Sequence, residues 1–300
     1  MREEARNGKA HRHRTPLDPR SVRVLVRGAG DLATGVGWRL ARSGFPVIMT
    51  EIDRPTVLRR SVAFAEAIYE GETIVEGIRA RRVPVAAIEA VLSAGEIPIL
   101  VDPELATLSH LSPSILIDGR MRKGRLDTRP TRREDAHFVV GLGPGFQAGK
   151  NVHAVVETQR GHHLGRVLYR GSASPDTGKP GVIAGESERR VLRAGQDGIF
   201  RTDRRIGTAV QAGEVIGHVD GMPVRAQISG IVRGLLHTGL PVRRRMKLGD
   251  IDPRGESAYC FTISDKSLAV AGGVLEALLH FLFGKGPVLP PTPPRPSPSE

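Results

Sequence analysis

The residues best suited to chemistry form a glycine-rich turn near the start of the chain. Gly28, Gly30 and Ala33 fit the pattern G-x-G-x-x-A, and Glu51 follows at the end of the next apolar stretch. In such a turn the first glycine permits a tight bend, the second lets a phosphate approach the backbone, and the small third residue lets the helix pack closely. An acid at about this spacing binds ribose hydroxyls. The pattern predicts a site for a nucleotide or another anionic ligand.

Asp31, which directly follows the second glycine, leaves two interpretations of this turn open. A carboxylate there would repel a pyrophosphate, which favours a scaffold that has lost its ligand. It would equally cap the following helix, since Asp is a favoured N-cap residue. We therefore keep Asp31, with the glycines, among the candidate ligand-binding residues.

The elements that position this turn follow from the spacing of apolar residues. Residues 22–26 alternate as a β-strand does, and residues 47–49 form a second apolar stretch. Between them, Leu32, Val36 and Leu40 recur at helical spacing. This order predicts a right-handed βαβ unit of Rossmann type.

Three further apolar stretches predict strands of the same parallel sheet, at residues 97–101, 115–117 and 138–140. Acids or glycines follow each stretch. Because the carboxyl ends of parallel strands meet at one edge of a sheet, these residues should surround one crevice. The residues expected at that edge are Glu51, Asp102, Asp118, Gly143 and Gly145.

The loop that follows contains His153, Glu157, Arg160 and His162. Two histidines and a carboxylate can bind a metal, but no HExxH spacing is present, and we predict no metal site. Backbone amides with Arg160 and His162 are instead expected to bind a phosphate or a pterin-like group.

Cys260 is followed shortly by Asp265 and Lys266. A cysteine among aromatic and aliphatic residues is most often a buried apolar group. The alternative is a sulfur-handling thiolate whose pKa these two charged residues would tune. The catalytic residues are therefore unknown, with Cys260, Asp265 and Lys266 as candidates, and whether the protein is an enzyme stays open.

A later region is duplicated: residues 198–220 align without a gap on residues 230–252. Short alternating segments between glycine turns predict β-strands in both copies. The duplication resembles the lipoyl/biotinyl barrel-sandwich hybrid. The hairpin between the copies, residues 220–224, has no lysine to modify, so a swinging-arm role is not expected. Two interpretations stay open: the domain binds, docks or covers the site, or it is a purely structural β-module.

Composition narrows the possible partners. The 300 residues carry a formal charge of +12, yet only 4% are aromatic, so we expect a small anionic ligand and not nucleic acid as the partner. One cysteine excludes a disulfide framework within the chain. The charged N-terminus and the absence of a long apolar run predict a cytoplasmic protein with no membrane segment.

Five long blocks between about Val22 and Leu282 are distinctive: RGAGDLATGV, FPVIMTEIDRPTVLRRSVAFAEAIYEG, VVGLGPGFQAGKNVHAVVETQRGHHLGRV, GDIDPR and ISDKSLAVAGGVLEALL. These blocks resemble the accessory protein family of selenium-dependent molybdenum hydroxylase systems. The first domain of that family is itself similar to the Rossmann domain of xanthine dehydrogenase accessory factors.

The resemblance implies an accessory or maturation factor for a molybdenum hydroxylase of xanthine dehydrogenase type. Such a factor binds the molybdopterin cofactor or a nucleotide and assists its sulfuration, selenation or insertion. The implied partners are the hydroxylase client protein and a small anionic ligand, with a homodimer possible. Two alternatives stay open: an NAD(P)-dependent oxidoreductase of a small substrate, and a ligand-free protein-binding scaffold.

The fold class expected from all of these features is α/β, with a Rossmann-like parallel sheet domain followed by the duplicated β-domain. The expected segments are a disordered basic N-terminus (1–20), the α/β domain (21–190), the barrel-sandwich hybrid domain (191–254), a C-terminal strand and helix packed on the α/β domain (255–283) and a disordered Pro-rich tail (284–300).

Overall fold

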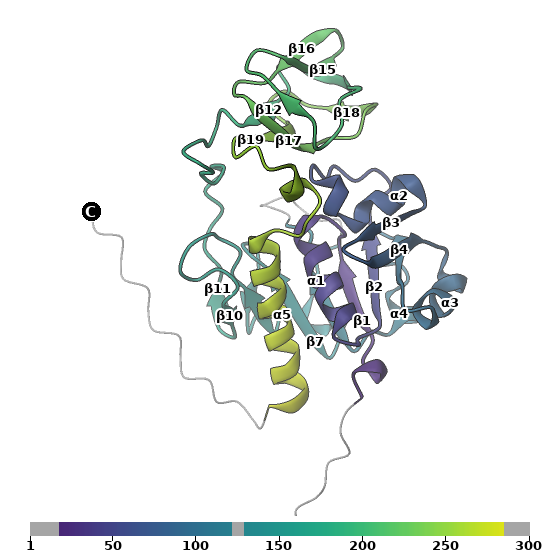
Figure 1. Ribbon diagram of the computed structural model, residues 1–300. Coiled ribbons are helices and arrows are strands. Elements are labelled where there is room, and N and C mark those ends of the chain that lie inside the picture. Colours follow the sequence, from purple (N-terminus) through teal and green to yellow (C-terminus); the bar gives the residue numbers. More distant parts are fainter. Residues whose placement is uncertain (1–17, 122–128, 285–300) are drawn as a thin grey trace, which may run out of the picture.

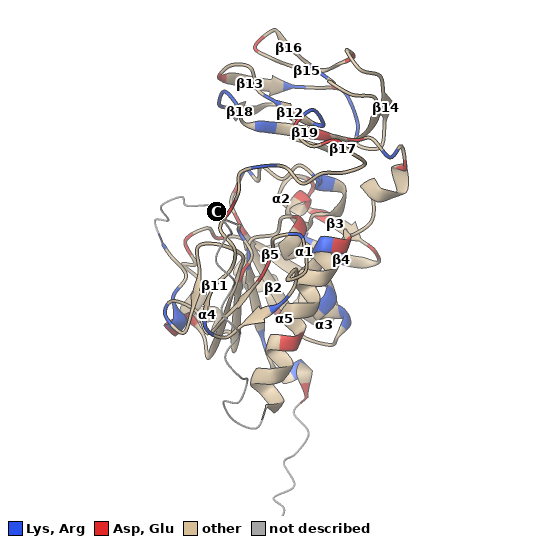
Figure 2. Ribbon diagram, turned by 90° about the vertical axis from the view of Figure 1, so that its left-hand side faces the viewer, with Lys and Arg blue, Asp and Glu red and all other residues tan. Residues whose placement is uncertain are grey.

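The computed structural model describes residues 18–121 and 129–284. An α/β part carries a large sheet, and a module made of strands lies beyond one end of it in both views (Figures 1 and 2). The two terminal segments expected to be disordered lie almost entirely outside the described residues. The predicted domain boundaries stay predictions.

Within the described ranges, the α/β part is built on one sheet of nine strands in the order β10-β9-β7-β6-β1-β2-β5-β4-β3. Its strands are β1 (Val24–Arg27), β2 (Val47–Glu51), β3 (Glu72–Val75), β4 (Ile78–Arg82), β5 (Ile97–Val101), β6 (Ile115–Asp118), β7 (Phe138–Leu142), β9 (Ala154–Val156) and β10 (Val167–Leu168). The central pairings are parallel, but β3 pairs antiparallel with β4, and β10 with β9. The predicted Rossmann-like parallel sheet is therefore wrong, because the sheet is mixed.

The antiparallel β3–β4 edge has a local cause. Glu76 and Gly77 join the two strands, and their φ angles are 42° and 82°. Two consecutive left-handed residues make the type I′ turn whose twist suits a two-residue hairpin. The chain therefore reverses at once, whereas a parallel pairing needs a long crossover.

Two long helices cover one face of the sheet, α1 (Asp31–Arg42) and α5 (Asp265–Phe283), and they lie side by side (Figure 1). Gly35 permits this close approach, since a Cβ there would overlap the hydroxyl of Ser267. The Ser267 hydroxyl donates to the carbonyl oxygen of Asp31 at 2.9 Å. The contact fixes the first turn of α1 relative to α5.

Helix α5 is apolar and long enough, by length and composition alone, to cross a membrane. Its residues Val270, Val274 and Leu278 are nevertheless buried in the core that α1 and the sheet share. One face of this helix is therefore part of the core of the α/β part.

Shorter elements complete the α/β part. The other face of the sheet packs against an apolar cluster that includes Ile88, Leu105 and Leu111. The remaining helices are α2 (Ala67–Glu70), α3 (Ile88–Ser93), α4 (Leu108–Leu111) and the 3-10 turns η1 (Pro19–Ser21), η2 (Arg60–Val62), η3 (Phe64–Glu66), η4 (Val85–Ala87), η5 (Arg133–Asp135) and η6 (Ser257–Cys260). A small antiparallel pair joins β8 (Gln147–Ala148) and β11 (Gly171–Ser172).

Residues 191–252 form a separate unit, called here the β-module. Its strands are β12 (Val191–Arg193), β13 (Gly198–Arg201), β14 (Ala209–Val210), β15 (Val215–Val219), β16 (Met222–Arg225), β17 (Gly230–Leu235), β18 (Leu240–Val242) and β19 (Lys247–Asp252). They form two four-stranded sheets, β12-β19-β17-β14 and β16-β15-β13-β18, with antiparallel pairing throughout. The sequence-based assignment to a barrel-sandwich hybrid is corrected to these two sheets, and a lipoyl-type barrel is not shown.

The two copies of the duplication contribute to both sheets. Strand β14 of the first copy pairs with β17 of the second, while β18 of the second pairs with β13 of the first. Side chains such as Phe200, Val232 and Leu248 fill the space between the sheets. The apolar side chains between the sheets are therefore buried by strands from both copies.

Hydrogen bonds attach the β-module to the segment after β2. The amide of Leu235 donates to the carbonyl oxygen of Leu58 at 2.8 Å, and the Nε of Arg60 donates to the carbonyl oxygen of Leu235 at 2.7 Å. Glu66 lies 2.9 Å from the Nε2 of His237. The β-module thus lies against the edge at which the central parallel strands end.

Candidate functional site

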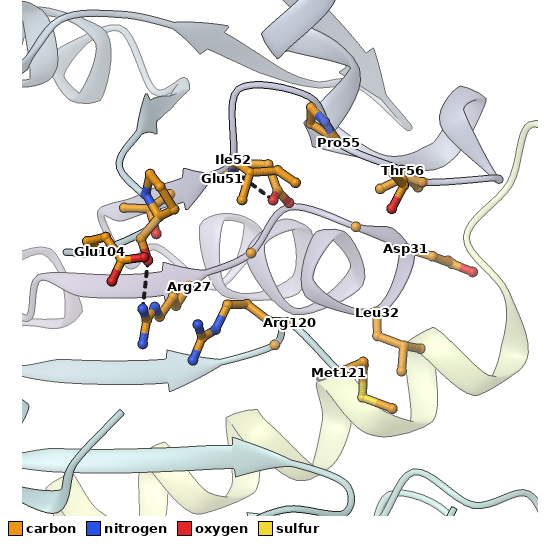
Figure 3. A pocket seen from close by; sticks show the side chains of 16 residues that line it. Arg27, Asp31, Leu32, Glu51, Ile52, Pro55, Thr56, Glu104, Arg120 and Met121 are labelled. Atoms are coloured by element: carbon orange, nitrogen blue, oxygen red, sulfur yellow. Dashed lines mark hydrogen bonds between the residues drawn. The ribbon is translucent and has the colours of Figure 1, made fainter. Parts of the chain in front are cut away.

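A cavity of about 720 Å³ lies at the carboxyl ends of β1, β2, β5 and β6. Figure 3 shows Arg27 and Arg120 side by side, across from Glu51 and Ile52. The glycine turn and the first residues of α1 form another part of the wall. The polar and glycine residues of the lining are Arg27, Gly28, Gly30, Asp31, Thr50, Glu51, Thr56, Glu104, Gly119 and Arg120.

The glycine turn is held in place by the strand beside it. The amide of Gly28, with φ at 96°, donates to the carbonyl oxygen of Thr50 at 2.7 Å. The carboxylate of Glu51 accepts from the amides of Ala29 at 2.8 Å and Ile52 at 2.9 Å. Burial raises the pKa of Glu51 above its ordinary value. Glu51 therefore binds the turn itself as well as bordering the cavity.

The N-terminus of α1 has no side-chain cap. Gly30 occupies the N-cap position and offers no side chain to bond the first-turn amides. Asp31 does not cap the helix, because its two carboxylate oxygens each lie 3.1 Å from the NH1 of Arg59. This ion pair offsets the negative charge that would otherwise oppose an anion. Asp31 therefore forms an ion pair, instead of capping the helix or standing as an uncompensated charge that repels a pyrophosphate.

A buried network supports the arginine side of the cavity. The carboxylate of Asp118 accepts from the Nε of Arg120 at 3.0 Å, from its NH2 at 2.6 Å and from the hydroxyl of Thr131 at 2.6 Å. Burial alone would raise the pKa of Asp118, but the hydrogen bonds and charge of Arg120 outweigh it and lower the pKa. Arg27 reaches the same network through Thr131, at 3.0 Å.

The network around Asp118 contains more positive than negative charge. Arg27 is 1% exposed, and its pKa falls to about 10 because of burial and the neighbouring charge of Arg120. Two guanidinium groups thus share one buried carboxylate, that of Asp118. A ligand that brings negative charge would relieve their mutual repulsion.

Two buried polar atoms at the cavity have no hydrogen-bond partner among the described residues. They are the hydroxyl oxygen of Thr50 and the Nε of Arg27. Thr50 is 1% exposed and lines the cavity. An unsatisfied buried hydroxyl costs about 1–3 kcal/mol, so a ligand that bonds it gains by doing so.

The structure does not bring all of the predicted ligand residues to one cavity. Gly28, Gly30, Asp31 and Glu51 line the cavity, while Ala33 and Asp118 are buried behind its wall. The glycine loop after β7 lies elsewhere. Gly143 packs against Thr158, and Pro144, between Gly143 and Gly145, lines a second cavity together with Arg160. The predicted single crevice is therefore two neighbouring cavities, and both are lined by Asp31 and Met121.

His162 and His153, the two histidines named in the predicted loop, make contacts outside the two cavities. The ring of His162 lies 5.0 Å from that of His163, and neither residue lines the two cavities. His153 accepts from the amide of Val139 through Nδ1 at 3.0 Å. The Glu157 carboxylate accepts from backbone amides and the hydroxyl of Ser174, so both residues stabilise their own loops.

The candidate thiol is enclosed. Cys260 is fully buried, its Sγ lies 3.7 Å from the carbonyl oxygen of Val232, and burial raises its pKa. Asp265 bonds Arg160 at 2.6 and 2.9 Å, which lowers the pKa of Asp265 to about 2. Lys266 lines the second cavity. The sulfur is therefore held as an apolar core group.

One cluster in the described part of the chain has the composition of a metal site: Glu66, Glu70 and His237. The NH1 of Arg60 lies 2.9 Å from Glu66 and 3.3 Å from the Nε2 of His237. A guanidinium so close repels a cation. The cluster is therefore a hydrogen-bonded contact between the α/β part and the β-module.

Sequence reasoning missed Arg27, Thr50 and Arg120, which form much of the cavity wall. The available signal was position: Arg27 and Thr50 are polar residues at the ends of otherwise apolar strands. Arg120 follows Asp118 by two residues, which lets its side chain fold back onto that carboxylate.

Comparison with known proteins gives one strong sequence relative. The chain is 48% identical over 260 residues to the uncharacterized protein YqeB of Escherichia coli K12. The match covers 86% of this chain and 48% of the relative, so the chain spans about half the length of that protein. No protein-family model matches.

Solved structures give only weak matches. A succinylglutamate desuccinylase/aspartoacylase from Rhodobacter sphaeroides matches with 15% identity and a TM-score of 0.23. An aspartoacylase family protein from Mesorhizobium loti matches with 11% identity and a TM-score of 0.22. Each match covers 77% of this chain and 84% of the other. The product-bound ectoine utilization protein EutE (DoeB) from Ruegeria pomeroyi has 11% identity and a TM-score of 0.21, covering 68% and 57%. Scores this low support no statement about shared fold or function.

These comparisons correct the assignment made from sequence blocks. The sequence relative is described as uncharacterized, no protein-family model matches, and none of the proteins named above is described as part of a molybdenum or selenium system. The expected membership in the molybdenum hydroxylase accessory family is overturned. The maturation role, and the oxidoreductase and scaffold alternatives stated with it, are not retained.

Proposed function

We propose that the protein binds a small phosphorylated ligand of the nucleotide type in the cavity at the carboxyl ends of β1, β2, β5 and β6. One observation carries this proposal. The uncapped N-terminus of α1 and the arginine pair border the same cavity, whose wall also contains the unpartnered hydroxyl of Thr50.

The charge distribution supports an anion on physical grounds. A helix N-terminus presents amide donors and a partial positive charge, which together favour a phosphate. Arg27 and Arg120 add two guanidinium groups to the same wall, and planar guanidinium forks suit phosphate oxygens. The ion pair of Asp31 with Arg59 offsets the negative charge of the acid that directly follows Gly30.

The size of the cavity and the position of Glu51 support a nucleotide over a bare phosphate. Small-molecule sites have volumes of roughly 300–1,000 Å³, and this cavity has about 720 Å³. A carboxylate has about four acceptor positions, so Glu51 can accept ribose hydroxyls beyond its two amide bonds.

Other sequence expectations stay proposals. A cytoplasmic location fits a phosphorylated ligand and a chain with one cysteine. A molybdopterin-type cofactor is an anionic ligand of the same chemical class. A protein client and a homodimer also stay predictions.

The test is a thermal-unfolding screen of the full chain with ADP, ATP, NAD, GTP and adenosine at equal ionic strength. We expect at least one phosphorylated compound to raise the Tm, and adenosine to raise it less. At one hundred times its Kd a ligand stabilises the fold by about 2.7 kcal/mol. If no phosphorylated compound raises the Tm, the proposal is wrong.

A matched pair of variants locates the ligand. Thr50→Val replaces the unpartnered hydroxyl with a methyl group, so the free protein should be at least as stable as the wild type. Loss of one ligand hydrogen bond should weaken affinity about threefold to tenfold. Thr73→Val, the same change on edge strand β3 outside the cavity, should leave affinity unchanged. Equal affinity in Thr50→Val and the wild type would move the ligand elsewhere.

A further inference from the structure

The second cavity, of about 500 Å³, lies between the α/β part and the β-module. We infer that it is a separate site for a phosphate or another dianion, held by Arg233 of the β-module. The inference does not depend on the nucleotide proposal, because different residues carry it.

Arg233 is the central observation. It is 8% exposed and lines the cavity, yet its Nε has no hydrogen-bond partner within the described part of the chain. Its nearest acid is Asp252, at 3.4 Å. That carboxylate is already bonded by the Nε and NH2 of Arg254, at 2.9 and 2.6 Å. A buried guanidinium with unused donors is costly unless an anion satisfies it.

The backbone directs this side chain towards the cavity. The pairing of β17 with β19 shifts register between Val232 and Gly234, so Arg233 lies at a β-bulge. Bulges re-aim side chains and are frequent beside functional sites. Arg201 occupies the same position in the first copy of the duplication, and it is exposed at the end of β13. Burial of the second arginine is therefore not a property of the repeat.

The surrounding charges favour a dianion. Burial, and then the positive charge of Arg59, lower the pKa of Arg233, so two arginines repel each other here. Three carboxylates also line the cavity, those of Asp31, Asp176 and Asp250. Six cationic side chains also line the cavity, and three of them already pair with carboxylates: Arg59 with Asp31, Arg160 with Asp265 and Arg190 with Asp250. The other three are Lys179, Arg233 and Lys266.

A ligand in this cavity would contact both parts of the protein. Arg59 and Arg160 belong to the α/β part, whereas Arg190 lies just before β12 and Arg233 is in β17. Ser174 and Thr158 add hydroxyl groups to the lining. Bound anion should therefore stabilise the α/β part and the β-module together.

The experiment measures the Tm of the full chain against inorganic phosphate, with succinate as a second dianion and sodium chloride holding ionic strength constant. We expect phosphate to raise the Tm in a saturable way. A response to succinate alone would identify a dicarboxylate as the dianion, and a response to neither would overturn the inference.

Arg233→Met separates binding from structure. Asp252, which pairs with Arg233, keeps its hydrogen bonds to Arg254 in this variant, so the Tm of the free protein should stay close to that of the wild type. The phosphate response should fall. Arg201→Met, its counterpart in the repeat, is exposed and should keep the full response. If phosphate raises the Tm of Arg233→Met as much as that of the wild type, the inference is contradicted. This outcome would not depend on whether a nucleotide binds in the first cavity.

A second variant covers the case in which Arg233→Met does not fold. Arg233→Lys keeps the charge but loses the fork of donors, and we expect phosphate affinity to fall about tenfold. Unchanged affinity in Arg233→Lys would show that the guanidinium does not contact the anion.

Discussion

Asp118 is the residue whose replacement should be most costly at the first cavity. The change Asp118→Asn keeps the shape of the side chain but removes the charge that balances Arg120 and Arg27. Breaking a buried ion pair by removing one partner typically costs about 3–5 kcal/mol, and Asp118 is 1% exposed. Its hydrogen bond from Thr131 adds to this loss. We therefore expect the free energy of unfolding to fall by about 3–5 kcal/mol.

Urea unfolding at neutral pH measures this change, and pH gives a second check. The folded-state pKa of Asp118 lies below its ordinary value, so its contribution is present above about pH 4 and is lost as pH falls further. The difference between wild type and variant should therefore shrink in acid. A cost below about 1 kcal/mol at pH 7, or a difference independent of pH, would refute the reasoning that Asp118 compensates the arginine pair.

Three further predictions concern groups outside this network. Cys260 should react with thiol reagents only after unfolding, because it is buried and its pKa is raised; rapid labelling of the native protein would contradict this. Gly35→Ala should lower stability by about 1–3 kcal/mol through overlap with Ser267, and Ser267→Gly should restore part of it in the double variant, measured by urea unfolding. Asp265→Asn should cost less than about 1 kcal/mol at pH 7, because its pair with Arg160 is largely exposed. That cost should vanish below about pH 2, since the pKa of Asp265 is about 2; a cost that persists in acid would exclude the ion pair as its source.

Local patterns predicted the elements around the glycine turn well. The alternation at 22–26, the helical spacing from Leu32 and the apolar 47–49 stretch correspond to β1, α1 and β2. The β3–β4 hairpin was missed, although its Glu76-Gly77 pair is a turn signal between alternating residues. That one hairpin helps make the sheet mixed instead of parallel.

Long-range pairings were beyond sequence reasoning. Nothing local indicates that Arg59 would pair with Asp31 and thereby change the meaning of an acid in the glycine turn. Arg201 and Arg233 have the same residue type and the same position in the repeat, yet one is exposed and the other buried. The difference arises because the α/β part covers Arg233 but not Arg201. The spacing of residues along the chain does not indicate that contact.

The central claim is that main-chain amides at the start of α1 bind a phosphate beside the arginine pair. The most direct measurement is an NMR titration of the ¹⁵N-labelled full chain with ADP, following amide resonances. The account predicts the largest saturable shifts at Gly30, Asp31 and Leu32, and smaller shifts in Thr50→Val at the same ADP concentration. Shifts confined to residues outside the first cavity, or none at millimolar ADP, would contradict it.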